Sequence, residues 1–126
     1  MRLLWVGLFL LAGCAAPGPA PVEEPPAPPP PEKTSENIAV AGLMDIARAD
    51  VAANRLGSAA ATLERALRIE PRNARLWHEL ALVRLKQGDY AQAVSTATRS
   101  NTLAGGDSAL RTANQRVIEE ARAARR

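Results

Sequence analysis

The sequence has very few residues of the kinds on which catalysis and metal binding depend. Its 126 residues include one cysteine, Cys14, and one histidine, His78. A lone cysteine excludes an intramolecular disulfide. His78 has only Glu79 beside it along the chain, whereas a general base needs an orienting partner and a nucleophile within hydrogen-bond reach. Glycine-rich phosphate loops and the His/Cys spacings of metal sites are also missing. We therefore expect no enzymatic activity, no metal and no cofactor, and an enzyme is the least favoured alternative.

Aromatic residues and charge of one sign are also scarce. Aromatic side chains make up 3% of the chain, and the formal net charge is only +3. The basic C-terminal end, residues 122–126, has no aromatic residues among its arginines, so we expect no nucleic-acid partner. This end fits an anionic lipid or acidic partner, or a solvated helix terminus whose cations match the negative end of the helix dipole.

The chain also lacks a hydrophobic run long enough to span a bilayer. Its apolar stretch, Leu3–Leu11, follows Met1-Arg2 and is too short for a transmembrane helix. One positive residue, a short apolar run and then small residues are typical of a secretory signal. The run ends in Ala12-Gly13-Cys14.

The stretch Leu11-Ala12-Gly13-Cys14 resembles the lipobox of bacterial lipoproteins. The resemblance implies that residues 1–13 are a signal peptide and that Cys14 becomes the acylated N-terminus, with covalent lipid as the membrane anchor. Ala15, in place of the Asp that favours inner-membrane retention, implies attachment to the outer membrane, facing the periplasm. The alternative interpretation of Cys14 is a small buried residue or a spare thiol.

Prolines are concentrated in one segment between the signal-like run and residue 38. Nine of the ten prolines lie between Pro17 and Pro31. Proline removes a backbone donor and fixes φ, and the segment has little apolar bulk to bury. We expect residues 14–37 to be a disordered, extended tether that reaches on the order of 60 Å. A ligand for a proline-recognition module is the alternative.

From residue 38 onward the apolar residues recur at helical spacing, and no strand pattern is present. Asn54, Pro71, Gly88 and Gly105-Gly106 interrupt the pattern. Asn73 and Asp107 supply N-cap side chains. The pattern predicts five helices, over residues 38–53, 57–69, 74–87, 90–102 and 107–124.

The helix pairs repeat at a period of 34 residues. Leu43-x2-Ile46-Ala47 aligns with Trp77-x2-Leu80-Ala81. This period, and above all the stretch from Ala66 to Ala81, resembles the tetratricopeptide repeat. The resemblance implies an all-α superhelical solenoid over residues 38–126, with repeat 1 at about 40–73, repeat 2 at about 74–106 and a capping helix at about 107–124.

The family pattern also gives expectations about packing. Trp77 is expected in the core, small residues are required where paired helices approach, and Asp50 and Arg84 are placed for a salt bridge between stacked first helices. Two repeats are close to the lower limit of stability. Either the last helix caps the stack, or the protein self-associates as a homo-oligomer, and the sequence leaves both open. The four close-approach positions are Ala47, Ala59, Ala81 and Ala93.

Members of this family bind proteins mainly along the concave face formed by the first helix of each pair. Carried over by position, that face predicts an apolar strip edged with positive charge. It suits an envelope protein or peptide with apolar anchors and acidic character. The predicted groove consists of Met44, Arg48, Val51, Arg75, His78, Leu82, Leu85 and Lys86.

Together these features predict a membrane-anchored, non-catalytic scaffold of the bacterial cell envelope. By family analogy, the first hypothesis is assistance in assembling a pilus or secretion machine. The alternative is an adaptor for peptidoglycan synthesis or envelope maintenance, in which a long spacer would matter more.

Changing Cys14→Ser should leave an unprocessed chain that takes up no labelled fatty acid, because Cys14 is the only residue that follows the signal-like run and could carry the lipid. Metabolic labelling with a radioactive fatty acid measures this. Normal labelling of the variant would contradict the lipoprotein interpretation.

Overall fold

The computed structural model describes residues 38–126, and the predicted signal peptide, lipidated Cys14 and proline-rich tether lie outside these residues. Five helices follow one another, which confirms the all-α fold. None of these five is both long and apolar enough to cross a membrane. The helices are α1 (Ile38–Ala52), α2 (Leu56–Ile69), α3 (Ala74–Lys86), α4 (Tyr90–Leu103) and α5 (Ser108–Ala124).

The turns and caps that connect the helices repeat at the same 34-residue period as the helices themselves. Asn54 (φ 57°) and Gly88 (φ 77°) are 34 positions apart, and both adopt the left-handed conformation that ends the first helix of a pair. Asn73 and Asp107, also 34 positions apart, cap α3 and α5 by accepting hydrogen bonds from backbone N–H groups. α5 therefore begins where the first helix of a third repeat would begin.

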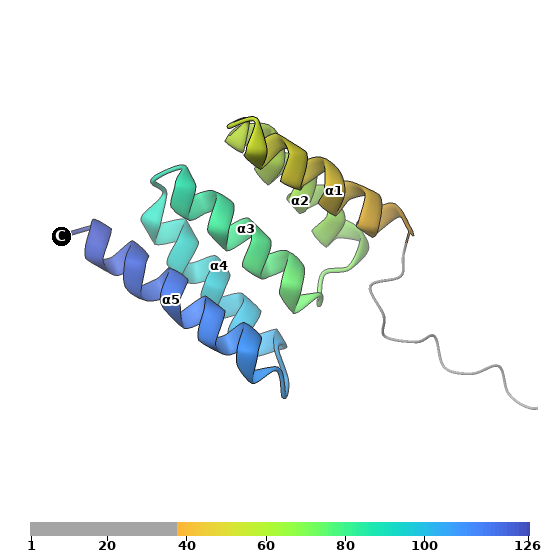
Figure 1. Cartoon of the computed structure of the whole chain (residues 1–126). Coiled ribbons are helices and arrows are strands. Elements are labelled where there is room, and N and C mark those ends of the chain that lie inside the picture. The colour runs from red at the N-terminus through yellow and green to blue at the C-terminus, as the bar shows by residue number, and fades with distance from the viewer. Residues whose placement is uncertain (1–37) are drawn as a thin grey trace, which may run out of the picture. The chain divides into compact units, whose positions relative to one another are not determined.

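The helices form two layers, with α1, α3 and α5 in one layer and α2 and α4 behind them (Figure 1). Paired helices approach closely at the alanines that the sequence predicted for this role. Ala59, Ala81 and Ala93 are fully buried, and Ala47 is 3% exposed. A larger side chain at these positions would push the two layers apart.

The core consists of two clusters of unequal bulk. The cluster that joins α1, α2 and α3 is built from Leu, Val and Met side chains together with alanines. The cluster that joins α3, α4 and α5 contains four alanines beside Val117 and Ile118. Since dispersion and burial both scale with side-chain size, the second cluster contributes less to stability than the first.

A buried polar network holds α5 on α3 and α4 and adds to the small apolar contribution of the second cluster. Asn114 is fully buried, and its Nδ2 donates to Ser100 Oγ (2.8 Å) and Asn101 Oδ1 (2.9 Å). Its Oδ1 lies 2.7 Å from His78 Nδ1, so the imidazole donates from Nδ1. Ser100 in turn donates to the carbonyl oxygen of Ala74 at 2.8 Å. The network joins three helices through hydrogen bonds rather than apolar bulk.

The structure corrects the expected position of Trp77. The indole is half-buried at the edge of the first cluster, and the neighbouring Leu76 is the fully buried side chain. Trp77 Nε1 donates to the carbonyl oxygen of Pro71 at 2.9 Å, and the Arg99 guanidinium lies 5.9 Å from the ring centre. An indole N–H needs a polar partner, which keeps this side chain at the edge of the core.

The expected salt bridge between Asp50 and Arg84 is also wrong. Asp50 accepts hydrogen bonds from Ser58 Oγ and from Arg55 Nη2, each at 2.6 Å. Arg84 pairs instead with Glu64 at 2.5 Å. Asp50 and Arg84 each bind a closer partner in or next to α2, so they do not form an ion pair with each other.

Changing Asn114→Ala should lower the free energy of unfolding by about 1–3 kcal/mol, because it leaves the Ser100 and His78 groups without a buried partner. Urea unfolding followed by circular dichroism measures the loss. Gln115→Ala, an exposed change on the same helix, is the control and should have little effect. Equal stability of the two variants would contradict the structural role of the network.

Stability should also depend on Asp50 in acid. The Ser58 hydroxyl, and then Arg55, lower the pKa of Asp50 below its ordinary value of 3.8. The folded state therefore favours the carboxylate, and this contribution is present above pH 4 and lost as the pH falls through the lowered pKa. Urea midpoints between pH 7 and pH 2 should fall less for Asp50→Asn than for the natural chain. Parallel pH profiles would contradict this assignment.

Candidate functional site

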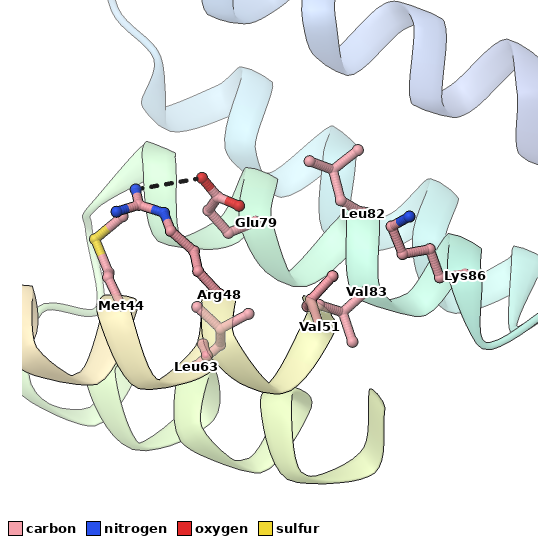
Figure 2. Close-up of a pocket in the computed structure, with 9 residues that line it drawn as sticks. Met44, Arg48, Val51, Leu63, Glu79, Leu82, Val83 and Lys86 are labelled. Carbon is pink, nitrogen blue, oxygen red and sulfur yellow. Dashed lines mark ion pairs between the residues drawn. The ribbon is translucent and has the colours of Figure 1, made fainter. Parts of the chain in front are cut away.

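A pocket of about 140 Å³ opens between α1 and α3 on the face formed by the first helices (Figure 2). Its floor consists of buried side chains, including Leu63, which reaches up from α2 between the two helices. Its rim consists of side chains that are half-buried or exposed. The floor residues are Met44, Ala47, Leu63 and Val83, and the rim residues are Arg48, Val51, Glu79, Leu82 and Lys86.

Helical spacing explains why these side chains meet. On α1, positions 44, 47–48 and 51 lie on one side of the helix, and on α3 positions 79, 82–83 and 86 do the same. Because α1 and α3 occupy equivalent places in successive repeats, their pocket-lining sides face one another. The repeat period thus sets the register between Arg48 and Leu82, which are 34 positions apart.

Ion pairs bridge one part of the rim. Arg48 Nη2 lies 3.8 Å from Glu79 Oε1, the contact drawn in Figure 2, and Arg48 Nη1 lies 3.4 Å from Asp45 Oδ1. The Arg48 side chain is 55% exposed, so each pair contributes at most about 1 kcal/mol. Lys86 makes no ion pair with the residues that the structure describes. Arg48 can therefore exchange Glu79 for the carboxylate of a partner, and Lys86 can accept a second one.

Five of the eight residues predicted for the groove line this pocket, from α1 and α3. They are Met44, Arg48, Val51, Leu82 and Lys86.

The other three predicted residues lie elsewhere, and two of them face α5, which packs against α3. His78 is half-buried and bonded to Asn114. Leu85 packs against the second core cluster. Arg75 is exposed in the first turn of α3 and does not line the pocket. The predicted continuous strip is therefore shorter, and it is centred between α1 and α3.

Sequence reasoning missed three of the four floor residues, Ala47, Leu63 and Val83, and the charged rim residue Glu79. Leu63 belongs to a second helix, which a rule confined to first helices leaves out. Glu79 had a usable signal, since it precedes Leu82, Val83 and Lys86 at helical spacing.

Comparisons with known proteins agree with this architecture. The tetratricopeptide repeat family model matches residues 50–116, and the chain belongs to this family. A solved structure, the globular C-terminal domain of P. aeruginosa LpoP, is similar with a TM-score of 0.68 and 40% sequence identity. The match covers 69% of this chain and 82% of that one. No curated protein matches the chain. The family and the fold indicate a domain that acts by interaction or regulation rather than by catalysis.

Proposed function

We propose that this tetratricopeptide repeat protein is a lipid-anchored adaptor of the bacterial envelope that binds a partner protein for peptidoglycan synthesis or envelope maintenance. The observation that carries the proposal is the apolar pocket between α1 and α3, on the face with which the family binds proteins. Catalysis has no part in the proposal, and the chain acts by holding or regulating its partner.

The likeness to LpoP favours this process over the assembly of a pilus or secretion machine, which the sequence alone placed first. In both proteins the helical domain lies in the C-terminal part of the chain. A proline-rich segment that reaches on the order of 60 Å would let a lipid-anchored domain meet a partner well away from the membrane surface. Neither comparison points to a pilus or secretion protein.

The size of the pocket suits one large apolar side chain. A cavity of about 150 Å³ lined by apolar side chains accommodates a benzene molecule, and the pocket volume is about 140 Å³. A leucine or phenylalanine anchor would therefore fill it. Acidic residues beside the anchor would reach Lys86 and would compete with Glu79 for Arg48. The partner segment we infer is an amphipathic helix or extended peptide with one such anchor and flanking carboxylates.

A triple variant, Arg48→Glu, Leu82→Glu and Lys86→Glu, tests the proposal. It places negative charge around the pocket without changing the buried floor, so the domain should fold while crosslinks to the envelope partner are lost. In-cell crosslinking followed by mass spectrometry measures this, and circular dichroism of the purified chains checks folding.

A matched triple variant, Arg65→Glu, Ile69→Glu and Arg122→Glu, is the control. It changes two exposed arginines and one exposed apolar residue outside the pocket, and it should keep the partner. If the folded pocket variant captures the same partner at an undiminished yield, the pocket is not the binding surface.

A further inference from the structure

The charges around the pocket between α1 and α3 are unevenly divided along its length. Glu79 and Lys86 lie seven positions apart on α3, which is almost two full turns, so both are on the same side of this helix. The apolar lining residues Leu82 and Val83 lie between them (Figure 2). Each charged residue is therefore about 5 Å along the helix axis from the middle of the apolar part. We call the two ends of the pocket the Glu79 end and the Lys86 end.

The Glu79 end has more negative than positive charge. Arg48 lies 3.8 Å from Glu79 and 3.4 Å from Asp45, so two carboxylates share one cation. The side chain of Glu79 is the less exposed of the two, at 29% against 78% for Asp45, and Glu79 is the one that lines the pocket. A carboxylate that enters this end must displace Glu79 from Arg48 and must then lie close to two negative groups.

The Lys86 end has a positive charge that no carboxylate of the described domain neutralises. Lys86 is exposed, and it makes no ion pair with another residue of this domain. Its neighbours in the lining of the pocket, Val51, Leu82 and Val83, are all apolar (Figure 2). A carboxylate of a partner can therefore pair with the ammonium group of Lys86 without displacing an internal one.

We propose that Glu79 makes the pocket directional, so that an acidic residue of the partner is favoured at the Lys86 end and disfavoured at the Glu79 end. This rests on the proposed function, in which the pocket holds the partner. Glu79 is then a specificity-determining residue, because it occupies Arg48 with an internal carboxylate and leaves Lys86 as the cation that recognises the partner. Repulsion of the wrong arrangement is a general route to specificity.

This division of charge defines the partner segment further. Its apolar anchor fills the middle of the pocket, and its carboxylate lies about 5 Å away on the Lys86 side. That separation fits an acidic residue three or four positions from the anchor in a helix, or two positions from it in an extended peptide. Of the flanking carboxylates of the partner, the one at Lys86 therefore contributes more to binding, since Glu79 and Asp45 repel the other.

Two synthetic peptides test the proposal on the full chain. Both contain one phenylalanine, and they differ only in having glutamate or glutamine two positions from it. The methyl signals of Met44, Val51 and Leu82 report occupancy of this pocket by NMR spectroscopy, and titration gives a Kd for each peptide. The ratio of the two Kd values measures the preference for the acidic residue. We expect the unchanged chain to bind the glutamate peptide about two- to fivefold more tightly at low salt.

Two changes at the ends of the pocket separate the roles of the two cations. Lys86→Gln should bring the ratio close to one, because Glu79 still holds Arg48. Adding Glu79→Gln to Lys86→Gln should restore a preference of about twofold or more, because Arg48 is then released to bind the peptide carboxylate. The matched control adds Glu119→Gln to Lys86→Gln. Glu119 is exposed on α5 and does not line the pocket, so this variant has the same net charge and its ratio should stay close to one.

The possible results distinguish failure of this proposal from failure of the proposed function. Equal binding of the two peptides by the unchanged chain, or a full preference in Lys86→Gln, would overturn the directional role of Glu79. The same holds if Glu79→Gln fails to restore the preference, or if Glu119→Gln restores it equally. If neither peptide moves the pocket methyl signals of the unchanged chain, the pocket is not the binding surface, and the proposed function fails as well.

Discussion

The close approach of paired helices at four buried alanines is the constraint on which the rest of the domain depends. Ala47, Ala59, Ala81 and Ala93 let the backbones of first and second helices come together, and none of them is more than 3% exposed. This approach places Leu63 of α2 high enough to form part of the pocket floor between α1 and α3. Larger side chains at the alanines would separate the two layers and move Leu63 away from the pocket floor.

The first and last helices of the described domain, α1 and α5, differ in how much of their apolar surface is buried. At the C-terminal end, α5 has the place of a first helix, and a buried asparagine network holds it on α3 and α4 beside the apolar contacts of Val117 and Ile118. Such a network is specific because every polar group must be satisfied at once. On α1, by contrast, Ile38 and Ile46 remain exposed.

α1 contributes side chains to the pocket and to the core. Val40 and Leu43 are buried in the core, and Ala47 belongs both to the core and to the pocket floor. Asp50, on the same helix, is bonded to Arg55 and Ser58 within the first helix pair and does not line the pocket.

The sequence by itself determined the five helices, their turns, the alanine contacts and five of the residues that line the pocket, because each depends on local spacing and on a period of 34 residues. It did not determine which side chains of different helices contact one another. Leu76 rather than Trp77 fills the core because an indole N–H must stay near a polar partner. Arg84 pairs with Glu64, and His78 turns from the groove to Asn114, because α2 and α5 supply partners that are close in space and distant in sequence. Only the tertiary structure brings these helices together, and so only it decides the floor of the pocket and the side of α1 that remains uncovered.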